Sequence, residues 1–284
     1  MSYIDLHVHS NISDGTMSPE EVVRHAAQNG LMAIALTDHD TVEGIAEAKR
    51  TAEELKKEGL NITVIPGIEI SAGYHKKDIH ILGYHIDETS KELNDTLQEI
   101  IAERTSRNDK MCANLQKAGI DITTDKLRAH HPDTVITRAH FARFMVENNY
   151  TKTMKEAFDK YLDSSTPYYV SREYLSPKKA ITLIKEAGGI PVLAHPLLYG
   201  LSLKELEDLL AELTSYGLAG IETFYSNNTG CDESNVRRLA RIFNLVMTGG
   251  SDYHGTNKPQ IQIGIGRGNL RIPDSILKEL AKFN

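Results

Sequence analysis

The chain has 284 residues, of which 40% are hydrophobic and 25% are charged, a composition typical of a globular protein. No apolar run approaches the roughly 20 residues that a membrane span needs, and the first residues lack the basic and apolar segments of a signal peptide. The net charge of −7 argues against a long nucleic-acid-binding surface, and two cysteines outside any Cys-x-x-Cys pair indicate a reduced, cytoplasmic protein.

The first ninety residues alternate between strand and helix patterns. Short strands are expected at residues 3–6, 32–36, 62–65 and 79–84. Ser18 is a helix N-cap signal, with Pro19 at the first helical position and Glu21 three residues after the cap, so a helix is expected from there to about Gly30. A second helix is expected at residues 42–57.

The same rhythm returns near residue 176. Helices are expected at residues 176–189, 203–216 and 232–243, and strands at 190–194, 219–223 and 245–248. Repeated strand–helix units predict a parallel sheet, either a barrel or a doubly wound sheet. Residues 87–168 interrupt the rhythm with four expected helices, at 90–119, 123–129, 137–148 and 152–162. We interpret this segment as a helical insertion over the barrel face where substrate sites form.

Many of the 12 histidines stand beside acidic residues at the ends of expected strands. His7 and His9 are two residues apart in extended backbone, and therefore project from one face. Strand ends of a parallel barrel meet at one rim, where imidazoles and carboxylates together suit Zn²⁺, Mn²⁺ or Fe²⁺. Nine residues are too many for one ion, which predicts a polynuclear metal site. These candidate ligands are His7, His9, Asp14, His39, Glu69, His80, His195, Asp252 and His254.

Each of these residues also has a structural interpretation. A single histidine at a strand end is usually a solvated or hydrogen-bonded rim residue, whereas ligands at five separate strand ends are hard to obtain by chance. His75 and His85 flank His80 and compete with it as ligands. Glu222 ends a strand, where it could either orient a ligand or form a structural salt bridge.

The candidate ligands lie in an ordered series of motifs: His7-Val8-His9-Ser10, Asp14-Gly15, Thr37-Asp38-His39, Pro66-Gly67-Ile68-Glu69, His80-Ile81-Leu82-Gly83, Leu193-Ala194-His195-Pro196 and Gly250-Ser251-Asp252-Tyr253-His254-Gly255. This series resembles that of the polymerase and histidinol phosphatase (PHP) family, and the match runs from one end of the chain to the other. The insertion resembles that of the stand-alone bacterial members, which include nucleotide bisphosphate phosphatases, enzymes acting on RNA 5′ ends and a cyclic phosphodiesterase.

The resemblance implies a distorted (β/α)₇ barrel at residues 1–86 and 169–284, with a helical cap at residues 87–168. It also implies two or three divalent ions, Mn²⁺, Fe²⁺ or Zn²⁺. A first ion is expected on His7, His9, Glu69 and Asp252, and a second on Glu69, His80 and His195. A third is expected on Asp14, His39 and His254.

The expected reaction is hydrolysis of a phosphate ester by a metal-bridging hydroxide held by the residues of the first two ions. The chain has no GxSxG nucleophile elbow, so direct attack is favoured over a phospho-enzyme. Arg138 and His140, near a helix start, and Arg172, where the chain re-enters the barrel, are the candidate contacts for a second phosphate.

The substrate is expected to be a small phosphorylated metabolite, with the 3′-phosphate of a nucleoside 3′,5′-bisphosphate as the preferred candidate. A cyclic phosphodiesterase acting on a phosphorylated sugar, a histidinol phosphatase and a 5′–3′ exonuclease on short RNA stay open. A non-catalytic binding module has no physical need for nine metal ligands, and an amidohydrolase usually needs only one or two ions. The sequence does not specify the oligomeric state.

Overall fold

The structure is a computed structural model that describes residues 2–75, 77–129, 134–171 and 173–283. Within these residues, seven strands form one sheet in the order of the chain. The strands are β1 (Tyr3–Val8), β2 (Leu31–Leu36), β3 (Thr63–Tyr74), β4 (Lys77–Tyr84), β5 (Ile190–Leu193), β6 (Gly220–Tyr225) and β7 (Val246–Gly250).

The first and last strands meet and nearly close the sheet into a barrel. The backbone N–H of Asp252 donates to the carbonyl of His7 at 2.8 Å, and that of His9 donates to the carbonyl of Tyr253 at 3.0 Å. This contact leaves neither β1 nor β7 as a free edge of the sheet, so the sheet is a barrel rather than a doubly wound sheet. The predicted distorted (β/α)₇ barrel is confirmed.

The expectation of a wholly parallel sheet is wrong at β4. This strand pairs antiparallel with both β3 and β5, whereas β1–β2–β3 and β5–β6–β7 pair in parallel. β3 ends at Tyr74 and β4 begins at Lys77, so the connection is far shorter than the dozen or so residues that a parallel crossover needs.

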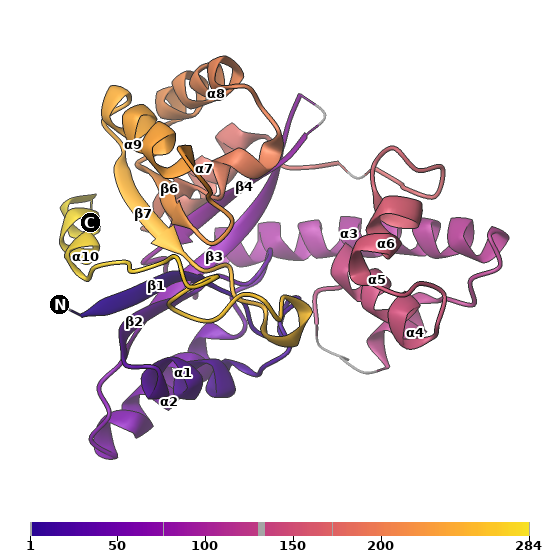
Figure 1. Ribbon diagram of the computed structural model, residues 1–284, viewed down its shortest axis with the longest axis horizontal. Coiled ribbons are helices and arrows are strands. Elements are labelled where there is room, and N and C mark those ends of the chain that lie inside the picture. The colour runs from indigo at the N-terminus through magenta and orange to yellow at the C-terminus, as the bar shows by residue number, and fades with distance from the viewer. Residues whose placement is uncertain (1, 76, 130–133, 172, 284) are drawn as a thin grey trace.

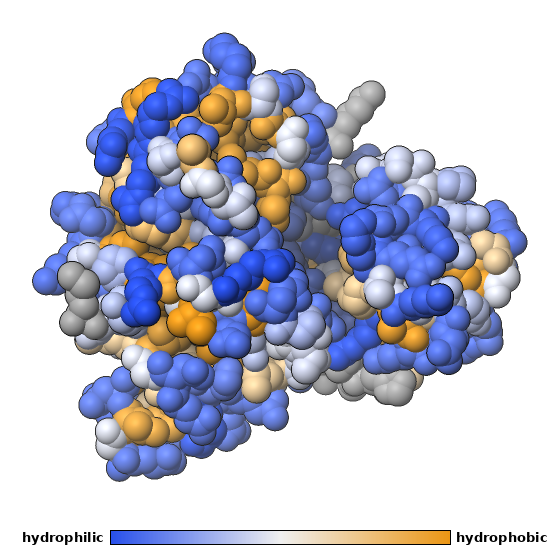
Figure 2. Space-filling model, in the orientation of Figure 1, coloured by the Kyte–Doolittle hydropathy of each residue, from blue (hydrophilic) through white to orange (hydrophobic). Residues whose placement is uncertain are grey.

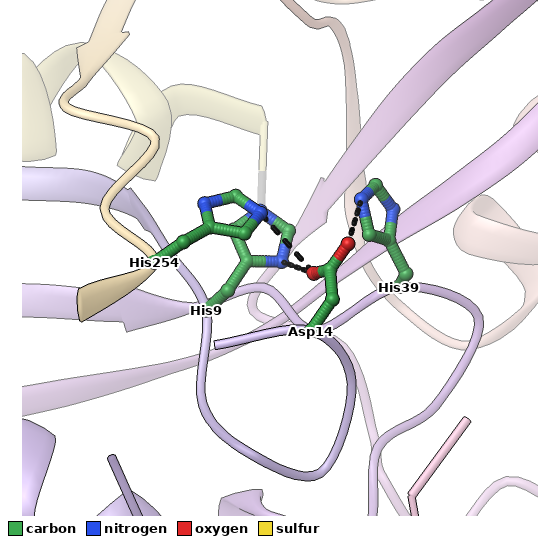
Figure 3. A group of neighbouring side chains, drawn as sticks. All are labelled: His9, Asp14, His39 and His254. Carbon is green, nitrogen blue, oxygen red and sulfur yellow. Dashed lines mark ion pairs between the residues drawn. The ribbon is translucent and has the colours of Figure 1, made fainter. Parts of the chain in front are cut away.

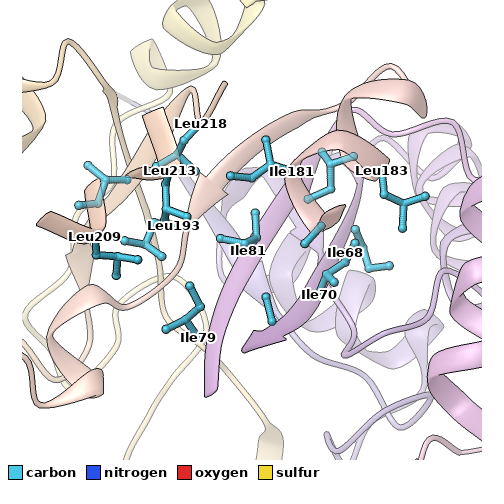
Figure 4. Packing of buried hydrophobic residues seen from close by; sticks show 14 of the residues in the cluster. Ile68, Ile70, Ile79, Ile81, Ile181, Leu183, Leu193, Leu209, Leu213 and Leu218 are labelled. Carbon is cyan, nitrogen blue, oxygen red and sulfur yellow. The ribbon is translucent and has the colours of Figure 1, made fainter. Parts of the chain in front are cut away.

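Amphipathic helices cover the outside of the barrel (Figure 1). Ser18 and Glu21 form the predicted capping box at the start of the first helix. Isoleucines of β3 and β4 pack against leucines and isoleucines of two of these helices, as Figure 4 shows, and burial of each such side chain stabilises the fold by about 1.5–3 kcal/mol. The helices are α1 (Pro19–Gln28), α2 (Ile45–Lys57), α7 (Pro177–Glu186), α8 (Leu203–Tyr216), α9 (Asp232–Ile242) and α10 (Ser275–Leu280).

The helices between β4 and α7 extend to one side of the barrel (Figure 1). The long helix α3 begins with leucines that belong to the barrel core and ends in a separate core built around Met111, Leu115 and Phe141. The insertion therefore contributes to both cores. The predicted boundary between barrel and insertion, at residues 86 and 169, stays a prediction. Its helices are α3 (Lys91–Lys117), α4 (Thr124–Arg128), α5 (Arg138–Glu147), α6 (Met154–Ala157) and the π-helical turn η1 (Phe158–Leu162).

Short 3₁₀ turns follow two of the strands that carry candidate ligands. They are η2 (Pro196–Tyr199), after β5, and η3 (Gly255–Asn257), after β7, and a third turn, η4 (Ala281–Phe283), ends the described chain. None of the described helices has both the length and the apolar character that a membrane crossing requires. The cytoplasmic location stays a prediction.

Candidate metal centre

Side chains from three parts of the barrel meet around the Asp14 carboxylate, as Figure 3 shows. Asp14 Oδ1 lies 3.1 Å from His254 Nε2 and 3.8 Å from His9 Nδ1, and Asp14 Oδ2 lies 3.8 Å from His39 Nε2. His9 follows β1, His39 follows β2 and His254 follows β7. The predicted convergence of these four residues is present.

Glu69, fully buried on β3, lies at the centre of the other imidazoles. Its Oε1 is 2.8 Å from His80 Nδ1 and 2.9 Å from His195 Nε2. Its Oε2 faces three more rings: His7 Nε2 at 3.3 Å, His9 Nε2 at 3.2 Å and His39 Nδ1 at 3.1 Å. The two oxygens therefore face different sets of nitrogens, as a bridging carboxylate requires.

Asp252 completes the set from the end of β7. Its Oδ1 lies 3.7 Å from His7 Nε2 and 3.5 Å from His9 Nε2. The backbone at Asp252 has φ 58°, a left-handed conformation that non-glycine residues rarely adopt, and His195 has φ 22°. Such strained residues cluster at functional sites, where the surrounding structure holds them in place.

Several ligand atoms at this centre are buried without a hydrogen-bond partner among the described residues. An unsatisfied buried polar atom costs about 1–3 kcal/mol, so a cluster of such nitrogen and carboxylate atoms fits a site that binds cations. Candidate ligand atoms also lie within 4.8 Å of one another in three groups, one each around Asp14, around His7, His9 and Glu69, and around His39, Glu69 and His80. Nitrogen and carboxylate donors fit divalent Zn²⁺, Mn²⁺ or Fe²⁺. The unsatisfied atoms include His7 Nε2, His9 Nε2, His39 Nδ1, Glu69 Oε2 and Asp14 Oδ1.

His39 belongs to two of these groups. The resemblance assigns it to the ion on Asp14 and His254, and its Nε2 does face Asp14, but its Nδ1 lies closer to Glu69. The division of the nine residues among separate ions stays a prediction.

The electrostatics favour metal-binding forms at part of the cluster. Burial opposes ionisation of Glu69, but the charges of the surrounding imidazoles outweigh it and hold the pKa of this carboxyl well below its usual range. Burial lowers the pKa of His39 to about 3 and also lowers that of His254, so both rings are neutral and can donate a lone pair. Burial also opposes charge on His9 and His80, but neighbouring carboxylates raise their pKa values to about 9 and about 10, so a cation must displace those protons.

Glu222 orients two of the candidate ligands. Its Oε1 is 3.0 Å from His7 Nδ1, and its Oε2 accepts the backbone N–H of His195 at 2.7 Å. The carboxylate thus fixes the tautomer of His7 and the place where the chain turns at His195. Of the two roles left open for Glu222, the geometry favours ligand orientation.

Three further contacts were not predictable from the sequence pattern. Tyr225 and Lys258 both donate to Asp252 Oδ2, at 2.7 and 2.6 Å. Thr137, the N-cap of α5, donates to Asp14 Oδ2 at 3.1 Å, so the insertion contacts a candidate ligand directly.

A cavity of about 270 Å³ opens above the cluster, and Figure 2 shows the surface hollowed between barrel and insertion. Asp14, His39, His80 and His254 form one part of its wall. Arginines of the insertion form another part, together with Met154 and Phe158; they are Arg104, Arg107 and Arg138.

The three predicted substrate contacts have different outcomes. Arg138 lines the cavity. Among the described residues, His140 is not part of the cavity wall; its imidazole is buried and caps α5 by accepting the backbone N–H of Thr137 at 3.1 Å. Arg172 lies outside the described residues.

Arg104 is a wall residue that the sequence did not single out. Its guanidinium is buried and pairs with Asp40, and it also donates to Ser71 at 3.0 Å. Asp40 follows His39 directly and accepts the backbone N–H of Ser71. An arginine of α3 is thus anchored beside a candidate metal ligand.

The family model of the PHP domain matches residues 5–182, more than half of the chain. The chain belongs to the PHP family. A relative from Haemophilus influenzae, a 5′-3′ exoribonuclease, is 36% identical over 98% of both chains. A 3′,5′-nucleoside bisphosphate phosphatase from Chromobacterium violaceum is 34% identical over 93% of this chain and 91% of its own. A phosphoribosyl 1,2-cyclic phosphate 1,2-diphosphodiesterase from Eggerthella lenta is 31% identical over 88% and 94%.

Two solved structures share this fold over nearly the whole chain. A structure from C. violaceum, described as an amidohydrolase with bound sulfate and no metal, superposes with a TM-score of 0.89, at 32% identity over 99% of this chain and 97% of its own. A protein from Bifidobacterium adolescentis, described as a candidate metal-dependent phosphoesterase, gives 0.88, at 28% identity over 100% and 96%. This PHP protein is a metal-dependent phosphoesterase, as predicted.

Proposed function

We propose that this PHP protein removes the 3′-phosphate of a nucleoside 3′,5′-bisphosphate. The observation that carries the proposal is one cavity with metal-ligand candidates on one part of its wall and arginines on another. A bisphosphate places one phosphate at each end of a short molecule, and a volume of about 270 Å³ is near the lower limit for small-ligand sites. The bisphosphate phosphatase among the relatives supports the choice.

The nine candidate residues are proposed to hold two or three divalent ions, in the sets that the resemblance implies. Such ions lower the pKa of water toward neutrality and neutralise charge on phosphoryl oxygens. Glu222 would keep His7 in the tautomer whose Nε2 faces the cluster. Arg138 would bind the 5′-phosphate and place the 3′-phosphate at the metal end, because a guanidinium recognises phosphate with two parallel hydrogen bonds.

Cleavage at the 5′ end of short RNA is the second candidate. The exoribonuclease from H. influenzae supports it, since the sequence match to that relative covers nearly the whole of both chains. The chemistry is shared: in either substrate, water adds to phosphorus, the bond from phosphorus to the 3′ oxygen breaks, and that oxygen takes a proton. A 5′-phosphorylated RNA end presents the same first nucleotide as a bisphosphate.

Arg138→Ala tests the proposal. In Mn²⁺-loaded protein, it should raise KM for a nucleoside 3′,5′-bisphosphate at least tenfold, yet leave KM for a 3′-monophosphate within twofold, because only the bisphosphate loses a charged partner. Phosphate release gives both constants. Arg143→Ala is the matched control, because Arg143 lies on the same helix but not on the cavity wall.

Equal effects of Arg138→Ala on KM for the two substrates would show that Arg138 does not bind a second phosphate. A screen of mono-, bis- and cyclic phosphates with the unchanged protein checks the substrate class. Exclusive hydrolysis of a cyclic phosphate would instead support the cyclic phosphodiesterase alternative.

A further inference from the structure

A buried arginine lies on α3, the long helix that runs from the barrel into the insertion (Figure 1). The buried face of this helix begins with leucines of the barrel core and ends with Met111 and Leu115 of the insertion core. Between these apolar groups the same face carries Arg104, which is only 7% exposed. Because a buried charge is costly unless it is paired, the partners of this guanidinium indicate what it does.

Arg104 pairs with Asp40, which is fully buried. Its Nε donates to Asp40 Oδ2 at 3.0 Å, and its Nη2 donates to the same oxygen and to Ser71 Oγ, the latter at 3.0 Å. The backbone N–H of Ser71 in turn donates to Asp40 Oδ1 at 2.8 Å. One edge of the guanidinium is therefore committed to Asp40 and Ser71.

Both of these partners lie beside a candidate metal ligand. Asp40 follows His39, and Ser71 lies two residues after Glu69 on β3. The backbone N–H of Asp40 donates to the carbonyl of Glu69 at 3.0 Å, and His39 Nδ1 lies 3.1 Å from Glu69 Oε2. The ion pair therefore lies next to the place where the chain at His39 meets the strand that carries Glu69.

The backbone at Asp40 has φ 53°, in the left-handed region that non-glycine residues rarely adopt. Such a conformation persists only where the surrounding contacts hold it. The contacts with Ser71 and Arg104 hold the Asp40 side chain, and they thereby fix the direction of the chain at His39.

Two other roles for Arg104 agree less well with these contacts. A phosphate is recognised by two parallel N–H groups, whereas the edge of Arg104 that carries Nε and Nη2 already binds Asp40. Arg138 differs, because its side chain is 30% exposed and lies 3.8 Å from Asp78. A purely stabilising role is also disfavoured, since apolar side chains often replace a buried ion pair without loss of stability.

We propose that Arg104 is a positioning residue for the metal centre, which holds His39 in place through Asp40. His39 belongs to two of the three groups of candidate ligands, so its orientation affects the site around Asp14 and the site around Glu69. A helix of the insertion thus sets the geometry of a shared ligand. The inference rests on the metal centre of the proposed function, but it does not depend on which phosphate ester is the substrate.

The double variant Arg104→Met with Asp40→Asn tests the proposal. It removes both charges of the pair together, and asparagine tolerates left-handed backbone. Mn²⁺ should bind about 10- to 100-fold more weakly, the usual cost of losing a group that orients a ligand. Tm of the metal-free protein should not fall. At saturating Mn²⁺, KM for a nucleoside 3′,5′-bisphosphate should stay within twofold. Equilibrium dialysis with elemental analysis measures the Mn²⁺ affinity.

Asn108→Ala is the matched control. Asn108 is buried on the same helix, and its amide donates to the carbonyl of Ile136 at 3.1 Å. Loss of this contact should lower Tm and leave the Mn²⁺ affinity within twofold. If the double variant does not fold, Asp40→Asn alone is measured in the same way, with the same expected loss of Mn²⁺ affinity.

The outcomes separate this inference from the proposed function. A double variant that binds Mn²⁺ as tightly as the unchanged protein overturns the inference, and so does an equal loss of affinity in Asn108→Ala. A raised KM for the bisphosphate with unchanged Mn²⁺ affinity also overturns it, since Arg104 would then bind phosphate. Unchanged protein that binds no Mn²⁺ overturns the metal-dependent function itself.

Discussion

At the scale of single residues, the two oxygens of Glu69 face different groups of imidazoles. One faces His80 and His195, and the other faces His7, His9 and His39. A carboxylate so placed can bind two cations at once without moving. The neighbours that orient the imidazoles then decide how well each cation is held.

Glu222 is the clearest of these orienting neighbours. Glu222→Gln keeps the size of the side chain but removes its charge, and its amide can donate where His7 and His195 need an acceptor. We expect about 10- to 100-fold weaker metal affinity or activity, the usual cost of losing such a partner. Elemental analysis of metal per chain, together with kcat/KM at rising Mn²⁺, measures both.

Glu233→Gln is the control for this variant, because Glu233 is a partly exposed surface partner of Arg237. It should change neither the metal content nor the activity. A Glu222→Gln protein with full metal content and full activity would show that Glu222 has only a structural role.

The residues that the sequence could predict are those whose spacing carries chemistry. His7 and His9, or Asp252 and His254, are informative because two residues in extended backbone point the same way. Tyr225, Lys258 and Thr137 are common residue types without such spacing, and only the fold brings them to Asp252 and Asp14. His140 was predicted as a phosphate contact, but its side chain accepts the backbone N–H of Thr137 at the N-terminus of α5.

At the scale of elements, the N-terminus of α5 connects the insertion to the metal centre. The hydroxyl of Thr137 accepts the backbone N–H of Ala139 at 3.2 Å and donates to Asp14 at 3.1 Å. The backbone N–H of Val135 also bonds to the carbonyl of Ile12, in the loop that carries Asp14. The insertion therefore restrains a candidate ligand as well as lining the cavity.

Replacing Thr137 with valine removes both roles of its hydroxyl. We expect a loss of about 1 kcal/mol in the free energy of unfolding, from the missing helix cap, and weaker binding of the ion proposed on Asp14. Urea denaturation measures the first effect and metal titration the second. Thr137→Ser keeps the hydroxyl and should restore both.

Thr153→Val separates the two roles. Thr153 caps α6 in the same way, by accepting the backbone N–H of Glu156, but it contacts no candidate ligand. This variant should lose stability only. The interpretation of Thr137 is contradicted if both valine variants bind metal equally well.

The hairpin of β3 and β4 shows the limit of prediction for elements. The sequence patterns at residues 62–65 and 79–84 predicted two separate strands, although Ile68, Ile70 and Ala72 alternate with more polar residues in the segment between them. In the structure, β3 continues to Tyr74, and His80 reaches Glu69 from an antiparallel neighbour. The type of element was predictable, but strand direction depends on a turn that spans too few residues to leave a pattern.

At the scale of the whole molecule, the candidate metal centre gathers residues from nearly every described strand. Removal of the metals by EDTA should abolish hydrolysis and lower Tm by several degrees, because ions that bind only the folded chain stabilise it. Reloading with Mn²⁺ should restore both. A thermal scan and phosphate release check this, and full activity in metal-free protein would falsify the metal-dependent mechanism.

The contact of β1 with the end of β7 has a consequence for how the enzyme acquires activity. Its hydrogen bonds place His7 and His9 beside Asp252 and His254, although these pairs lie near opposite ends of the sequence. A ribosome-bound chain that still lacks Asp252 and His254 has an incomplete set of candidate ligands. Catalytic activity therefore arises only after β7 has paired with β1. In refolding experiments, recovered turnover should therefore lag behind recovered helical circular dichroism.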